Sequence, residues 1–165
     1  MELLDIYDDQ GKRTGRTIVR GDKTAKLDEH EHIALSIIFI ENNKHEFLIQ
    51  KASKEKGAYY SSTGGHVNHG ETPQETIIRE IEEELGIQVD PKEIQELGFI
   101  HYDMPLRYLF YMKKDIKIED CKLQVEEVDF IDYKTKEEIE ELIKKKEFLE
   151  SHGILFHELE KRINR

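Results

Sequence analysis

Apolar residues occur along the chain in short stretches separated by polar turns, at spacings that predict both strands and helices. The stretch 32–41 is rich in β-branched residues and almost wholly apolar, which predicts a central buried strand. Asn42, Asn43 and Lys44 favour a turn, so residues 46–52 should return as the neighbouring strand. The same reasoning predicts a hairpin over residues 1–21 and strands over 94–102, 107–112 and 125–132.

One stretch in the middle of the chain carries the signals of a helix. Thr72 and Glu75 form a capping box, and Gly86 suits the left-handed residue that follows a helix, so a helix is predicted from Pro73 to Leu85. Its apolar residues share one arc about 100° wide and should face the core: Ile77, Ile78, Ile81 and Leu85.

The C-terminal region, about residues 135–163, predicts two helices. Thr135 and Glu138 form a second capping box, and apolar residues follow at helical spacing. His152 and Gly153 are expected to end that helix, and the apolar positions 155, 159 and 163 indicate a last short helix.

Three acidic residues of the central helix suggest chemistry. Glu80, Glu83 and Glu84 are expected on the side opposite the apolar stripe, where residues three and four apart are neighbours. Three like charges in one patch repel unless a divalent cation neutralises them, and hard carboxylate oxygens suit Mg²⁺ or Mn²⁺. The alternative is an acidic, solvated helix face. Arg79 lies four residues before Glu83 and could orient that carboxylate, while Glu71 could brace Arg79.

The stretch from Gly65 to Ile87 places glycine, arginine and glutamate at the spacing of the Nudix box, and the chain therefore resembles the Nudix hydrolase superfamily. The resemblance implies an α/β fold, an α/β/α sandwich with a mixed β-sheet, that hydrolyses a diphosphate bond. It implies metal ligation by the Gly65 carbonyl with Glu80, Glu83 and Glu84. Arg79, Glu83 and Glu84 would serve catalysis.

A further carboxylate, to accept a proton or complete the metal shell, often follows the box in such enzymes. Glu126 and Glu127 are adjacent in a predicted strand and so should face opposite ways. Glu127 is preferred for catalysis, because its surroundings resemble a segment in which isopentenyl-diphosphate isomerases hold a metal. Two exposed strand-edge acids are the alternative.

The N-terminal half is similar to that isomerase branch, which makes an isomerase the alternative enzyme. His32 and His66 match two of its metal-ligand positions. Gly64 stands where the catalytic cysteine would be, and Cys121 is too distant along the chain to replace it. Otherwise His32 is a packing or hydrogen-bonding residue and His66 contacts substrate. A noncatalytic nucleotide-binding module is the other alternative.

Length and charge limit the remaining functions. The 165 residues predict one domain, and 25 Lys and Arg against 36 Asp and Glu give a formal charge of −11, with no basic stripe for duplex nucleic acid. A single cysteine, no signal-like N-terminus and no long apolar run predict a cytoplasmic protein without a membrane anchor.

The partner is expected to be a small-molecule diphosphate of open identity. Tyr60, Arg107 and His66 are candidate substrate contacts. The family resemblance adds a possible homodimer.

Overall fold

The computed structural model describes residues 2–163. The strands are β1 Leu3–Tyr7, β2 Arg13–Val19, β3 Ala34–Glu41, β4 Glu46–Ala52, β5 Tyr60–Ser61, β6 Thr63–His66, β7 Gln95–His101, β8 Leu106–Lys113 and β9 Val128–Thr135. The α-helices are α1 Pro73–Leu85, α2 Lys136–Lys144 and α3 Glu150–Arg162, and short 3-10 helices occupy Lys54–Lys56, Pro91–Glu93 and Ile118–Asp120.

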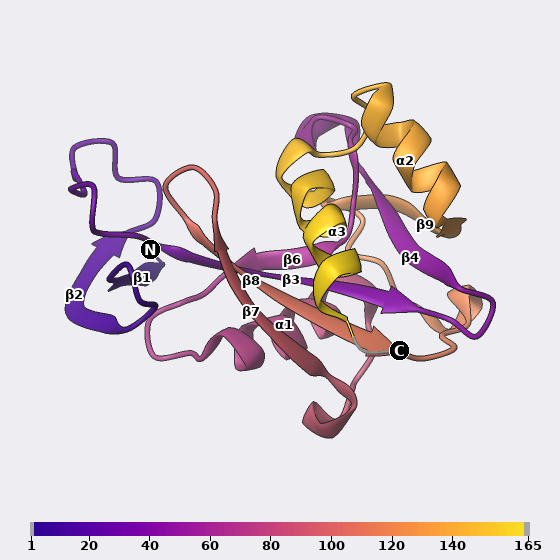
Figure 1. Ribbon diagram of the computed structural model, residues 1–165, viewed down its shortest axis with the longest axis horizontal. Helices are drawn as coiled ribbons and strands as arrows, with labels where there is room; N and C mark the ends of the chain where they lie inside the picture. Colours follow the sequence, from indigo (N-terminus) through magenta and orange to yellow (C-terminus); the bar gives the residue numbers. More distant parts are fainter. Residues whose placement is uncertain (1, 164–165) are drawn as a thin grey trace.

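The main sheet is mixed and is centred on β3 (Figure 1). Its order is β5-β4-β3-β8-β7, with β6 also paired to β3 and β9 to β4. β3 and β8 are parallel over their whole length, whereas the other pairs are antiparallel. The strand over 46–52 is confirmed, but it pairs with β3 only at Glu41 and Phe47. β4 pairs with β9 along its whole length, and beyond Phe47 its other edge leaves β3, where β6 takes its place.

Helices cover both faces of this sheet (Figure 1). On one face, Ile77, Ile81 and Leu85 of α1 pack with Ile38 and Phe110 in a buried cluster. On the other, side chains from α2 and α3 pack with the alternate residues of β3 and β8, as in the cluster of Phe39, Leu109, Ile139, Leu155 and Phe156. The predicted α/β/α sandwich with a mixed sheet is confirmed.

The central helix has the predicted bounds and caps. Thr72 Oγ1 accepts a hydrogen bond from the Glu75 N–H, while the Glu75 carboxylate accepts from the Thr72 N–H. Gly86 has φ 70°, and a Cβ there would lie 2.7 Å from Lys122 Cβ. The helix therefore ends where only glycine is unstrained and uncrowded.

The N-terminal hairpin is also confirmed, as the two-stranded sheet of β1 and β2. It lies at the end of the molecule opposite α2 (Figure 1). Leu4, Ile6 and Tyr7 are buried, and Tyr7 exchanges backbone hydrogen bonds with His32. The hairpin is thus packed against the residues that lead into β3, which starts at Ala34 and not at His32.

The predicted break at His152 and Gly153 is wrong. Both residues lie inside α3, and the chain turns earlier, between the end of α2 and Glu150, where Lys146 has φ 60°. Gly153 faces Ile143 of α2: a Cβ there would lie 3.3 Å from Ile143 Cγ1. A mid-helix glycine costs about 1 kcal/mol, which close helix packing can offset. The last helix is therefore longer than predicted: it spans 13 residues, and Ile163 is its C-cap residue.

The strand predicted over 125–132 is shifted. β9 begins at Val128, and residues 125–127 form a turn in front of it. It pairs with β4, with Leu48 opposite Tyr133 and Gln50 opposite Ile131.

In the described part of the chain, no helix is long and apolar enough to span a bilayer.

Candidate active site

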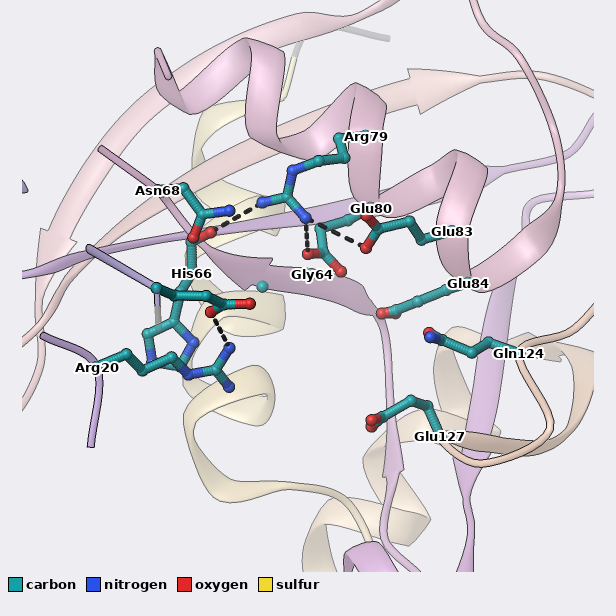
Figure 2. Close-up of a pocket in the computed structure, with 12 residues that line it drawn as sticks. Arg20, Gly64, His66, Asn68, Arg79, Glu80, Glu83, Glu84, Gln124 and Glu127 are labelled. Carbon is teal, nitrogen blue, oxygen red and sulfur yellow. Dashed lines mark hydrogen bonds and ion pairs between the residues drawn. The ribbon is translucent and has the colours of Figure 1, made fainter. Parts of the chain in front are cut away.

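A pocket of about 330 Å³ opens between α1, β6 and the turn before β9, in the region where β4 diverges from β3. Glycine and polar residues form its lining: Glu2, Arg20, Gly64, Gly65, His66, Asn68, Arg79, Glu80, Glu83, Glu84, Gln124 and Glu127. Figure 2 shows the glutamates of α1 on one wall, with Glu127 and Gln124 opposite Arg20 and His66 across the opening. Among residues 2–163 no apolar side chain lines it, so the pocket suits a charged group.

Arg79 holds the acidic residues in place. Its Nε and Nη2 donate to the two oxygens of Glu71, at 2.7 and 3.0 Å. Its Nη1 donates to Glu80 Oε1 at 2.7 Å and to Glu83 Oε2 at 3.2 Å, and Nη2 also reaches the His66 carbonyl at 3.1 Å (Figure 2). One guanidinium therefore ties the preceding loop and β6 to two carboxylates of α1. Both contacts predicted for Arg79 are present.

Glu84 is placed differently from the prediction. It is only 7% exposed and lies at the border of the apolar stripe. Seven residues after Ile77 amount to about 700°, just short of two turns, so Glu84 nearly shares the direction of Ile77. Burial raises the pKa of Glu84 to about 8, and the charge of Glu80 adds to that effect. Gln50 Nε2 donates to Glu84 Oε1 at 3.1 Å and opposes the rise.

Gly64 and Gly65 are needed for a reason that their sequence did not reveal. They lie in β6, and neither has a positive φ. A Cβ on Gly64 would lie 2.5 Å from the Ser36 carbonyl oxygen, and one on Gly65 would lie 2.4 Å from Glu80 Cδ. The absence of side chains therefore lets β6 approach β3 and lets Glu80 reach the strand.

Glu126 and Glu127 lie in a turn, so the premise that a strand points them apart is wrong. Glu127 nevertheless lines the pocket, and its Oε1 is 3.3 Å from Lys56 Nζ. The Glu126 carbonyl accepts a hydrogen bond from the Ser53 hydroxyl, which anchors the turn.

The three candidate substrate contacts are separated by the fold. His66 lines the pocket, where burial lowers its pKa to about 4 and keeps the ring neutral at pH 7. Arg107 lies two strands away, since both His66 and Arg107 pair with Leu35, and its guanidinium stacks over Tyr102. Tyr60 lies outside the pocket, under the ammonium of Lys51.

His32 is a hydrogen-bonding residue. Its Nδ1 contacts the Met104 carbonyl at 2.8 Å and its Nε2 contacts Asp9 Oδ1 at 2.6 Å. Burial opposes protonation, but these two acceptors hold the pKa of His32 above its ordinary value. With both ring nitrogens occupied, His32 has no lone pair to offer a metal.

Sequence reasoning missed four residues of the lining. Glu2 and Arg20 come from the N-terminal hairpin and are paired at 2.9 Å, and Asn68 and Gln124 come from loops. None of them belongs to the spaced motif, and only the docking of the hairpin beside β6 brings Arg20 to His66. No local pattern could have identified them.

The donor set fits a divalent cation. Within residues 2–163, no three His, Cys, Asp or Glu side chains are gathered as a ready metal cage. Glu80 and Glu83 turn to Arg79, and Glu84 turns to Gln50. The hard carboxylate oxygens on one wall suit such an ion. Burial raises the pKa of both Glu80 and Glu84, and a bound cation would oppose this by favouring the ionised carboxylates.

Comparison with known proteins agrees with this geometry. The model of the NUDIX domain matches residues 30–159. An uncharacterised Nudix hydrolase of Listeria monocytogenes is 34% identical over 153 residues, which cover 90% of this chain and 89% of that protein. An isopentenyl-diphosphate Delta-isomerase of Corynebacterium diphtheriae is 32% identical over 94 residues, 54% of this chain and 50% of its own.

The fold has solved counterparts as well. A crystal structure of a Deinococcus radiodurans protein superposes with a TM-score of 0.78 at 19% identity, over 94% of this chain and 98% of that one. The chain belongs to the Nudix family. Members of this family are hydrolases that act on pyrophosphate bonds, and they generally require divalent metal ions.

Proposed function

We propose that the protein is a Mg²⁺-dependent hydrolase that cleaves the diphosphate linkage of a nucleoside diphosphate derivative or a related organic diphosphate. One observation carries the proposal: in a pocket that polar side chains and glycines of residues 2–163 line, Arg79 fixes Glu80 and Glu83 beside the buried Glu84. Burying a carboxylate next to another is costly unless positive charge joins them. The pocket therefore favours a cation and its anionic substrate.

Glu80, Glu83, Glu84 and the Gly65 carbonyl are the proposed holders of the cation, with Mn²⁺ as an alternative to Mg²⁺. When bound, such an ion neutralises diphosphate oxygens and lowers the pKa of a bound water. The residues of the chain supply the positioning. Arg79 keeps two carboxylates oriented, and Gln50 keeps the third.

Glu127 is the proposed acceptor of the proton of the attacking water. It faces the α1 carboxylates across the pocket (Figure 2). The water oxygen forms the new bond to phosphorus, the bridging oxygen leaves with the other phosphate, and Glu127 takes the proton that water releases. Lys56 Nζ lies 3.3 Å from Glu127 Oε1, and this ion pair helps to hold the carboxylate at the pocket.

The isomerase alternative is disfavoured by Gly64. A cysteine at this position would need a Cβ 2.5 Å from the Ser36 carbonyl, a backbone atom that cannot rotate away. Cys121 packs against the buried cluster that contains the apolar residues of α1, and it does not line the pocket. A pure binding module is disfavoured by the carboxylates themselves, since phosphate recognition alone does not call for them.

The test is a panel of organic diphosphates incubated with Mg²⁺, with chromatographic identification of the products. We expect at least one compound to be split into two products that each carry a phosphate. No cleavage should occur in the presence of a chelator. Tight binding without cleavage across the panel would favour the binding module. Rearranged isopentenyl diphosphate without phosphate release would establish the isomerase.

A further inference from the structure

A second pocket, of about 310 Å³, adjoins the acidic pocket and shares Arg20 and His66 with it. We propose that this pocket, called here the hairpin pocket, binds the organic half of the substrate, and that it selects a compact, uncharged group with an apolar surface. The inference rests on the proposed function, because it assumes that the acidic pocket holds the diphosphate.

The chemistry of the hairpin pocket is opposite to that of its neighbour. Apart from Arg20, His66 and Asp22, its side chains are aliphatic or sulfur-containing, namely Leu4, Ile18, Val19, Ala25, Leu27, Ile33 and Met104. A diphosphate ester has the same division, with charge at one end and carbon at the other. Two adjoining pockets of contrasting polarity therefore match one molecule that spans both.

The residues at the junction suit the point where phosphate meets carbon. Arg20 is a cation held by Glu2 at 2.9 Å, and its exposed guanidinium keeps further N–H donors for an anion. His66 is half-buried and lines both pockets, so its ring can contact the group that joins the diphosphate to the organic half. Together they separate the anionic side from the apolar side.

The connection from β2 to β3, residues 20–33, forms much of the wall and has no regular structure of its own. Long connections of this kind in compact domains are often functional. At one end of it, Thr24 donates two hydrogen bonds to Asp22 Oδ1. The wall is thus a loop with local order at that end.

At the other end, a polar clasp joins three segments. Asp9 of the hairpin turn accepts from His30 and His32 at 2.6 Å each, and His32 contacts the Met104 carbonyl at 2.8 Å. Met104 belongs to the tip between β7 and β8, and its side chain lines the hairpin pocket. The clasp explains how sequence-distant apolar residues are kept around one space, and it makes His32 a positioning residue.

The proposal also excludes some substrates. Hydroxyl-rich groups such as hexoses, or a second charged group, would lose hydrogen bonds to water against the aliphatic wall. A nucleobase or a short hydrocarbon offers the required apolar surface, and the experiment separates these two sources.

The test measures equilibrium binding of analogues whose diphosphate bridge is a methylene group, so that turnover cannot interfere. The probes are a nucleoside methylenediphosphonate, a short alkyl methylenediphosphonate, a hexose methylenediphosphonate and methylenediphosphonate alone. The variants are Leu27→Asp, which makes the wall charged, and Ala25→Phe, which fills the pocket. Ile118→Asp is the matched control, because Ile118 is 37% exposed and lines neither pocket.

We expect the nucleoside or the alkyl probe to bind more tightly than the hexose probe. Leu27→Asp and Ala25→Phe should each weaken that binding at least about tenfold, the scale of a lost apolar contact in a specificity pocket. Methylenediphosphonate alone should bind all variants equally, and Ile118→Asp should match the wild type. Circular dichroism confirms that each variant is folded, and Ala25→Phe retains an apolar wall should Leu27→Asp fail to fold.

Equal weakening of the organic probes and of methylenediphosphonate would overturn the proposal, as would tightest binding by the hexose probe or no binding by any organic probe. The proposed function fails separately: if organic probes bind in a Leu27-dependent way but no diphosphate is ever cleaved, the hairpin pocket stands and the hydrolase proposal falls.

Discussion

The acidic pocket and the hairpin pocket lie side by side but are encoded in different ways. Most carboxylates of the acidic pocket come from one helix, where Glu80, Glu83 and Glu84 follow at fixed spacing. The wall of the hairpin pocket comes from β1, β2, the connection 20–33 and the β7–β8 tip. The proposed catalytic glutamates of α1 thus come from a local motif, whereas the proposed recognition surface depends on tertiary packing. The two should respond differently to mutation.

The largest difference is expected from the glutamates of α1. Glu83→Gln and Glu84→Gln should each lower turnover by about 10³-fold, because an amide cannot replace the charge that the cation and substrate require. Both variants should fold. Glu84→Gln should lose little stability, since burial already disfavours the ionised carboxylate. Steady-state kinetics and thermal unfolding measure both effects.

The matched control for these variants is Glu82→Gln. Glu82 lies on the same helix but is exposed and does not line the pocket. It should leave turnover within about twofold, as expected of a surface position. Comparable losses of turnover in Glu82→Gln and Glu83→Gln would mean that turnover depends on the total charge of α1 and not on the carboxylates in the pocket.

A smaller loss is expected at the turn before β9. Glu127→Gln should reduce turnover by about 10²-fold, the usual contribution of a general base. Glu126→Gln should have little effect, because it is the backbone carbonyl of Glu126, and not its side chain, that binds Ser53. Parallel kinetics of the two variants decide the matter. The reverse ranking would show that the acceptor of the proton had been misassigned.

The two glycines of β6 should separate stability from activity. Gly64→Ala places a Cβ against a backbone carbonyl and should destabilise the fold by about 1–3 kcal/mol. Gly65→Ala displaces the Glu80 carboxylate, a flexible group, and should mainly reduce turnover. Denaturant unfolding and kinetics on both variants give the comparison. An inactive but fully stable Gly64→Ala variant would contradict it.

The last comparison concerns stability alone, which two buried histidines should make depend on pH in opposite directions. Burial lowers the pKa of His152 to about 3, so the unfolded state binds the extra proton. Relative to His152→Gln, the free energy of unfolding of the wild type should fall by about 1.4 kcal/mol for each pH unit below 6.5.

The raised pKa of His32 works the other way. The stability from its clasp should be fully present below pH 6.5 and should decline as pH rises through the folded-state pKa. His30 and His101 adjoin the clasp, so His32→Gln is the variant that isolates this contribution. Unfolding curves between pH 4 and 9 measure both histidines. Slopes of the same sign for the two would refute the assignments.

The predictable parts of the fold are those whose signals are local. A capping box and a left-handed glycine fixed both ends of α1, because caps depend on residues within one turn. The predicted end of the helix before residue 152 is wrong, since Gly153 disfavours a helix in isolation but packs against Ile143, and His152 is buried inside α3. Tertiary packing outweighed local propensity there.

The candidate site divides in the same way. The contacts of Arg79 with Glu71 and Glu83 are predictable from spacing, whereas Arg20 and Glu2 reach the pocket only because the hairpin docks beside β6. The prediction for Glu84 is wrong because its position lies near the edge of the apolar stripe, where β4 supplies Gln50 as a hydrogen-bond partner for the buried carboxylate.

The central claim is that the carboxylates of α1 bind divalent cations. Equilibrium binding of Mn²⁺, followed by electron paramagnetic resonance, tests it most directly in the wild type and in the Glu83→Gln, Glu84→Gln and Glu82→Gln variants. Saturable binding by the wild type and Glu82→Gln, weakened at least about tenfold in the other two, is the predicted result. Equal affinity in all four proteins, or no saturable binding by the wild type, would contradict it.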